Sequence, residues 1–223
     1  MKKIIVLSAL ALACSGLAFS DPMPAACVTG GLGSYVNLGS TGCTVGNLLF
    51  YNFFVNSSPT SIGTNVLSSG VAPVPTTNNP GLAFNVGLPM TPPGGTQDVE
   101  IDYIVKVEAG APITDSSFSV VASGGSAATE GECLGGLFST GCSGGTQMSL
   151  TTNSTTLAAS NTFTGTWTID VKTDINSDGG IISGEAEHFS ETSSTVPEPA
   201  SLTLFGSGLL GLAFLLRRKV FTS

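Results

Sequence analysis

Apolar and polar residues alternate strictly from Asp98 to Glu108, and this alternation limits the fold more than any other feature of the chain. Every second position is apolar, and most of the positions between them are charged: Val99, Ile101, Tyr103, Val105 and Val107 share one face. A period of two residues is typical of a β-strand with one buried face. The segment therefore predicts a half-buried strand.

The segment 162–172 repeats this pattern and is predicted to be a second such strand, with Gly165 at a bulge or a close approach and with Phe163, Trp167, Ile169 and Val171 inward. Further strand candidates are 47–55, 82–88, 117–122, 147–152, 155–158 and 181–191. A helical period is sustained nowhere beyond about two turns, and 32–38 is the best candidate for a short helix.

Two segments interrupt the predicted strands: the proline-containing segment 71–95 and the Gly/Ser-rich segment 124–145. Many short strands predict an all-β fold, a single antiparallel β-sandwich of jelly-roll-like type.

The N-terminal residues 1–20 resemble a secretory signal peptide. Lys2 and Lys3 precede an apolar run, and small residues lead to a predicted cleavage site before Asp21. Acylation of Cys14, as in a lipoprotein, is the alternative. Both readings place the region 21–196 outside the cytoplasm.

The C-terminal segment 201–216 holds 16 residues without a charge, about 24 Å of helix at roughly 1.5 Å per residue. The cations 217–219 follow it and extend its reach towards the roughly 30 Å of a bilayer core. They also favour leaving the tail 220–223 in the cytoplasm. The segment predicts a transmembrane helix that ends in a basic stop.

The prolines of 197–199 hold the chain extended just before this helix. Together with the span and the basic stop, the sequence VPEPAS resembles the PEP-CTERM sorting signal of exopolysaccharide-producing bacteria. The resemblance implies recognition by exosortase, a membrane protease-transpeptidase, and implies a temporary anchor. A permanent anchor is the alternative. The residues of the predicted sorting site are Pro197, Glu198, Pro199, Arg217 and Arg218.

The predicted exported domain 21–196 is strongly acidic. It contains two lysines against fourteen carboxylates, a net charge of −12. Such a surface repels nucleic acid and anionic lipid, so we expect neither as a partner.

Four cysteines remain after export, and they allow three pairings. In an oxidising compartment we expect the two local pairs, Cys27 with Cys43 and Cys133 with Cys142. A zinc site is the weaker alternative, because no CxxC occurs and His188 has no partner at ligand spacing. The segment around Cys27 and Cys43 is also similar to the opening of a group of uncharacterised PEP-CTERM proteins, which implies the same first pair.

The segment 174–185 matches the spacing of a calcium-binding loop, D-x-[DN]-x-[DN]-G-x5-E. The candidate ligands are Asp174, Asn176, Asp178, Gly180 and Glu185. No helix is expected on either side, and Asn-Ser-Asp-Gly-Gly also suits a β-hairpin turn. No other cofactor is expected.

The sequence patterns that could indicate an enzyme are weaker than the match to a calcium-binding loop. Glu100 and Asp102 lie two apart on the outer face of a strand, where a solvated charged face is the usual reading. We therefore expect an exported, non-enzymatic protein of the cell surface or the extracellular matrix, with a structural or adhesive role in an exopolysaccharide biofilm. A carbohydrate-binding module, with exopolysaccharide as partner, is the first alternative, and a secreted hydrolase with paired carboxylates is the second.

Overall fold

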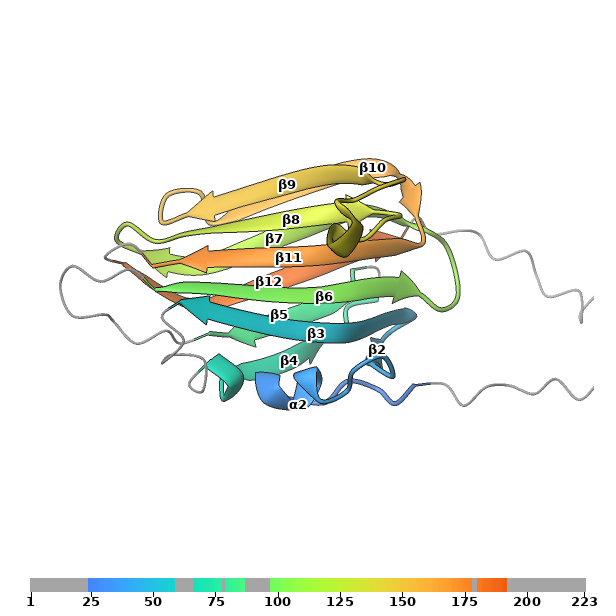
Figure 1. The fold of residues 1–223 in the computed structure, drawn as a ribbon, viewed down its shortest axis with the longest axis horizontal. Coiled ribbons are helices and arrows are strands. Elements are labelled where there is room, and N and C mark those ends of the chain that lie inside the picture. The colour runs from blue at the N-terminus through green and yellow to red at the C-terminus, as the bar shows by residue number, and fades with distance from the viewer. Residues whose placement is uncertain (1–23, 59–65, 78, 87–96, 178–179, 192–223) are drawn as a thin grey trace, which may run out of the picture.

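The computed structural model describes residues 24–58, 66–77, 79–86, 97–177 and 180–191, which form two six-stranded sheets in two layers (Figure 1). Sheet A contains, in spatial order, β2 (Cys43–Val45), β3 (Leu48–Ser58), β6 (Asp98–Val107), β11 (Thr168–Asn176), β8 (Ala127–Leu134) and β9 (Thr146–Asn153). Sheet B contains β1 (Gly30–Gly31), β4 (Gly70–Val74), β5 (Gly81–Asn85), β12 (Ile181–Glu191), β7 (Ile113–Ser123) and β10 (Ala158–Thr166). The paired strands within each sheet are antiparallel, so the predicted all-β fold with two antiparallel sheets is confirmed.

The strand β6 lies at the centre of sheet A, between β3 and β11. Its predicted inward residues are all buried, and its acidic residues point away from the core. Tyr103 is the hub of the core: its ring stacks on Phe53 at 5.3 Å between centroids and meets Phe84 of sheet B at 5.9 Å. These aromatic contacts join the two sheets.

The described residues also include short helices. The helix α2 (Leu32–Val36) confirms the predicted short helix, and it buries Leu32 and Tyr35. The 3-10 helix η2 (Phe138–Thr140) lies in the Gly/Ser-rich loop after β8.

The predicted strand 162–172 is two strands in different sheets. β10 ends at Thr166 in sheet B, and β11 begins at Thr168 in sheet A. Trp167 therefore sits at the corner where the chain changes sheets, and it is 56% exposed, so its predicted inward position is wrong. The close approach at Gly165 is confirmed, because a Cβ there would lie 2.7 Å from Cγ of Pro112.

Two strands lie where sequence reasoning placed loops. β4 occupies the start of the proline-containing segment, and β8 lies inside the segment 124–145. β8 was missed because glutamates, rather than aliphatic residues, occupy half of its inward positions. The predicted strand 155–158 was also wrong: it falls mostly in the connection between β9 and β10.

The predicted signal peptide 1–20 and the predicted membrane helix 201–216 lie outside the described residues. So do the sorting residues Pro197, Glu198, Pro199, Arg217 and Arg218. Within the described ranges, no helix has the length and apolar character needed to cross a membrane.

Candidate functional site

Two disulfides connect the four described cysteines, and both predicted pairs are confirmed. Cys27 bonds Cys43, with their Cα atoms 4.8 Å apart, and this bond holds the N-terminal segment against β2. Cys133 bonds Cys142, with their Cα atoms 5.6 Å apart. Because these sulfurs are all in disulfides, they do not form the alternative zinc site.

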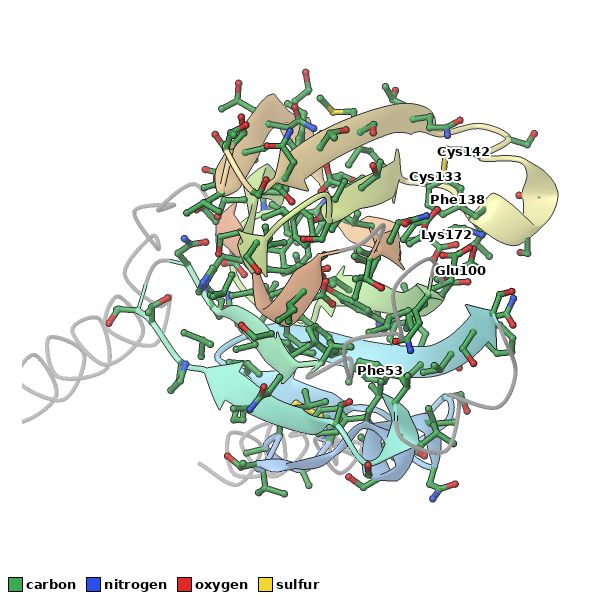
Figure 2. All side chains as sticks on the ribbon, turned by 90° about the vertical axis from the view of Figure 1, so that its left-hand side faces the viewer. Phe53, Glu100, Cys133, Phe138, Cys142 and Lys172 are labelled. Atoms are coloured by element: carbon green, nitrogen blue, oxygen red, sulfur yellow. A yellow bond between two sulfur atoms is a disulfide. The ribbon has the colours of Figure 1, made fainter. Side chains whose placement is uncertain are left out.

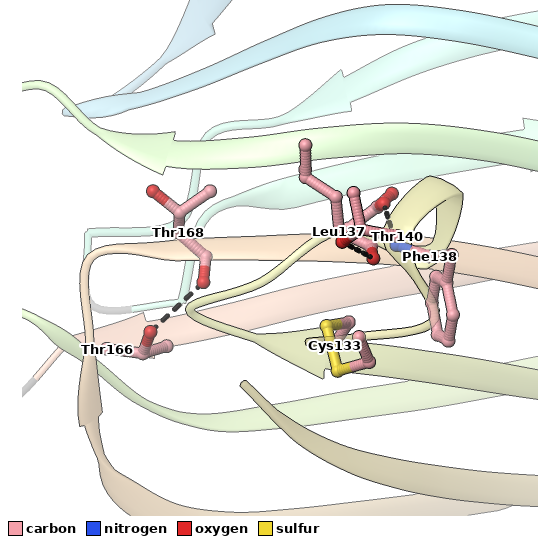
Figure 3. The surroundings of a disulfide bond; sticks show 8 residues. Cys133, Leu137, Phe138, Thr140, Thr166 and Thr168 are labelled. Atoms are coloured by element: carbon pink, nitrogen blue, oxygen red, sulfur yellow. Dashed lines mark hydrogen bonds between the residues drawn. A yellow bond between two sulfur atoms is a disulfide. The ribbon is translucent and has the colours of Figure 1, made fainter. Parts of the chain in front are cut away.

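The Cys133–Cys142 bond closes a loop over the outer side of sheet A (Figure 3). The backbone N–H of Phe138 donates to Oδ2 of Asp170 at 2.7 Å, which ties η2 to β11. The Phe138 ring also lies close to Gly131 of β8: a Cβ atom at position 131 would be 3.3 Å from this ring. The backbone N–H of Gly135 also donates to the carbonyl of Thr168 at 2.8 Å. The loop is thus held by the disulfide, by two hydrogen bonds to β11 and by the packing of one aromatic ring.

The outward side chains of β6 and β11 form an acidic face, which we define by Asp98, Glu100, Asp102, Asp170, Lys172 and Asp174. Figure 2 shows Glu100 and Lys172 close to the loop that carries Phe138. Nζ of Lys172 lies 2.5 Å from Oε2 of Glu100. Burial, with the neighbouring Glu100 carboxylate, raises the pKa of Asp102 to about 6. Burial, with a hydrogen bond to Asp98, raises the pKa of Asp174 to about 6.

Glu100 and Asp102, the pair considered for a hydrolase, lie on this acidic face at consecutive outward positions of one strand. Lys172 lies opposite Asp102 in the ladder and pairs with Glu100. Glu100 and Asp102 are thus part of a charged outer face of a sheet, and both lie next to the same cation, Lys172.

The candidate calcium ligands are divided by the fold. Asp174 and Asn176 are exposed on the outer side of β11, whereas Glu185 is buried on β12 and faces the space between the sheets. Asp178 lies outside the described residues. Among the described side chains, no three His, Cys, Asp or Glu residues lie close enough to hold a metal ion. β11 and β12 belong to different sheets, so the segment between them is a crossover and the hairpin alternative is wrong.

Four glutamates point into the space between the sheets, and sequence reasoning did not single them out. This interior carboxyl cluster consists of Glu130 and Glu132 on β8 and Glu185 and Glu187 on β12. Their spacing in the sequence could have identified them: Glu185 and Glu187 lie at alternate positions of the strand, on the same face as the buried aromatic residue Phe189.

Few hydrogen bonds reach the interior carboxyl cluster. Oγ1 of Thr173 donates to Oε1 of Glu187 at 2.5 Å, and Nδ2 of Asn161 donates to Oε2 of Glu132 at 3.4 Å. Within the described part of the chain, both oxygens of Glu130 and both of Glu185 lack a hydrogen-bond partner. Burial raises the pKa values of Glu185 and Glu187 to about 8, and burial raises that of Glu130 well above its usual range. These side chains therefore favour the neutral, protonated form.

A groove with a volume of about 460 Å³ crosses the outer side of sheet B. Its floor is formed by β4, β5, β12 and β7, and the outward residues there are small or neutral: Gly70, Ala72, Ala83, Asn85, Ser119, Val121, Ser183, Gly184 and Ala186. Glu185 also borders it, but its side chain is buried. The outward residues of this groove are thus uncharged, whereas the outer side of sheet A is acidic.

The model of the PEP-CTERM protein-sorting motif matches residues 195–219 of the chain. This match confirms the predicted sorting signal. A comparison with curated proteins finds no significant match.

Among solved structures, the chain is similar to TmCBM61 in complex with β-1,4-galactotriose, with 11% identity and a TM-score of 0.33 over 62% of this chain and 84% of that one. It is also similar to the family 11 carbohydrate-binding module of Clostridium thermocellum in complex with a β-1,3-1,4-mixed-linked tetrasaccharide, with 11% identity and a TM-score of 0.29 over 66% and 91%. These similarities are too distant to assign a ligand to this chain.

Proposed function

From the PEP-CTERM protein-sorting motif that the chain carries at residues 195–219, we propose that the protein is exported and delivered to an exosortase-type enzyme in the inner membrane. Its C-terminal helix is a temporary anchor, and the released domain reaches the cell surface or the extracellular polysaccharide matrix. Its role there is structural or adhesive and not enzymatic. The sorting motif is the observation that carries the proposal.

Two features of the domain support this route. Both disulfides suit an oxidising compartment outside the cytoplasm, where thiols pair and stay paired. The last described residue of the two-sheet body is Glu191, and the matched motif begins four residues later, at residue 195. A processing enzyme at the membrane would thus meet the motif beyond the last strand that the structure describes.

Mass spectrometry of the protein recovered from its host tests the route. We expect an N-terminus at Asp21, a C-terminus that lacks the segment 201–216, and two intact disulfides. An uncut chain in the cytosol with reduced cysteines would overturn the proposal.

A variant pair links the processing to the motif itself. Glu198→Ala removes the central side chain of the PEP sequence, and we expect the uncut protein to accumulate in the inner membrane. Ser194→Ala, just outside the matched residues, is the control and is expected to be processed normally. Equal processing of both variants would contradict a role for the motif.

The groove on sheet B favours a second candidate function, the binding of an uncharged polysaccharide. Its outward residues offer hydroxyl and amide groups from Ser119, Ser183 and Asn85, and small side chains leave room for a flat ring. The acidic outer face of sheet A would repel an anionic polymer, so a neutral glycan is the better partner.

Affinity electrophoresis against neutral polysaccharides tests this second function. Ala186→Tyr fills the groove, and we expect it to abolish retardation of the protein by the polymer. Ser117→Tyr is the matched control, because Ser117 lies on the same outer side of sheet B but does not line the groove. Retardation of neither the unmodified protein nor the control by any polymer would reject glycan binding.

A further inference from the structure

One side of the sandwich ends in two long strand edges. β9 is the edge of sheet A and β10 is the edge of sheet B, and they lie together along the top of the molecule in Figure 1. Among the described residues, β9 pairs only with β8, and β10 pairs only with β7. Each therefore presents one side of its backbone without a strand partner.

The opposite side of the sandwich is closed in a different way. Its edge strands β1 and β2 have only two and three residues. The helix α2 and the Cys27–Cys43 disulfide lie at these edges and shorten the open backbone. Short and covered edges are the usual protection against pairing with another chain.

The long edges lack this protection. From Thr146 to Thr166 the sequence contains no charged residue and no proline. Charged side chains and prolines are the residues that natural edge strands use to prevent pairing. The exported domain carries a net charge of −12, so two copies repel each other least where this uncharged side meets its equivalent.

Several apolar side chains on this side are only partly covered. Met148 on β9 and Ala159 and Phe163 on β10 pack against the core but are only partly buried. Leu157, in the connection between the two strands, is 49% exposed. A chain that paired with the edges would cover these apolar groups.

The register identifies the backbone groups that face outward on β10. The N–H of Val120 donates to the carbonyl of Leu157 at 2.9 Å. Hydrogen-bonded positions alternate along an antiparallel pair, so the amides of Ala159 and Asn161 face β7. The amides of Ala158, Ser160 and Thr162 therefore face away from sheet B.

We propose that this side is a homotypic interface, through which two copies of the chain pair edge to edge. A two-fold axis normal to the sheets places β10 antiparallel to β10 of the second copy, and it places β9 against β9 in the same way. Both sheets then continue across the dimer. The outward amides of Ala158, Ser160 and Thr162 supply the hydrogen bonds of the new ladder.

Sedimentation of the disulfide-bonded protein isolated from the producing cells tests the interface. We expect a concentration-dependent dimer. Ser160→Pro removes one outward N–H and keeps the ladder to β7, and we expect it to raise the dimer dissociation constant about tenfold or more. Ser160→Ala keeps the N–H and is expected to dimerise like the unmodified protein.

A second pair of variants guards against misfolding of the proline variant. Ser160→Glu keeps the backbone N–H and places like charges close together across the two-fold axis, so we expect weaker dimers. Val121→Glu adds the same charge to an exposed site on the outer side of β7 and is expected to dimerise normally. Hydrogen exchange of the amides at 158, 160 and 162 should slow as the concentration rises.

Three results would overturn the proposal. A protein that is monomeric at every concentration has no such interface. A dimer that survives both Ser160→Pro and Ser160→Glu uses another surface. Amides at 158, 160 and 162 that exchange equally fast in monomer and dimer lie outside the interface.

Discussion

Glu187 is a carboxyl group that the fold keeps away from water. It is fully buried, accepts one hydrogen bond from Thr173, and leaves Oε2 without a partner among the described residues. An ionised carboxylate in such a place would be very unfavourable, so the protonated form is retained and the pKa rises to about 8. The folded protein therefore binds protons at this site that the unfolded chain releases above its usual pKa.

This raised pKa predicts a pH-dependent stability. Between the usual glutamate pKa of about 4.5 and the folded value of about 8, the folded state binds more protons, so stability falls as the pH rises through this window. Glu187→Gln keeps an oxygen acceptor for Thr173 and cannot ionise. We expect it to stabilise the protein by on the order of 2 kcal/mol at pH 8 and to have little effect at pH 4.

Urea unfolding at the two pH values, with disulfides intact, measures this difference. The unmodified protein, measured at the same two pH values, is the reference. A Glu187→Gln variant whose effect on the free energy of unfolding is the same at pH 4 and pH 8 would show that folding does not raise the pKa of this carboxyl.

At the scale of elements, β6 and β8 show what the sequence reveals and what it hides. β6 has a strict apolar alternation, and its predicted inward face is the observed one. β8 lies in the same sheet, but Glu130 and Glu132 occupy its inward positions, so hydrophobic periodicity gives no signal. The interior carboxyl cluster and the missed strand therefore have one cause. The groove on sheet B could not be predicted either, because it depends on the order of the strands.

The loop closed by Cys133 and Cys142 leads to a prediction about stability. The two cysteines of this disulfide are nine positions apart in the sequence. Loss of a disulfide that closes a loop of this size should lower the free energy of unfolding by about 2 kcal/mol. We expect the double variant Cys133→Ala/Cys142→Ala to show this loss in urea unfolding. Asp170→Asn, which weakens the hydrogen bond from Phe138 and keeps the disulfide, is the comparison and should have a smaller effect. Equal losses would mean that the hydrogen bond, and not the disulfide, holds the loop.

The crossover between β11 and β12 leads to a prediction about calcium. Calcium binding by the segment 174–185 stays a prediction, and Asp178→Ala should lower calcium uptake in equilibrium dialysis. Glu185→Gln should leave the uptake unchanged, because its carboxyl is buried between the sheets. Equal binding by the unmodified protein and Asp178→Ala would end the hypothesis.

At the scale of the whole molecule, the charges are distributed unevenly over the two sheets. The acidic face of sheet A carries five carboxylates around Lys172, whereas the groove side of sheet B is formed by neutral residues. A protein with such a body has one side that repels anionic polymers and its own copies, and other sides where contact is less opposed by charge. The proposed groove and the proposed edge interface both lie on the neutral sides.

This distribution predicts that salt stabilises the protein at pH 8. Raising the salt from about 0.01 M to about 0.1 M shortens the screening length from about 30 Å to about 10 Å and weakens the repulsion among the carboxylates of the acidic face. We expect the free energy of unfolding to rise by on the order of 1 kcal/mol, and by more in Lys172→Met, where the repulsion is greater.

Since Asp102 and Asp174 have pKa values of about 6, the effect of salt should shrink at pH 5, when both take up protons. Urea unfolding across this series of salt and pH measures the effect. If salt lowered the stability instead, the ion pairs of Lys106 and Lys172 would outweigh the repulsion, and the acidic face would be a stabilising network.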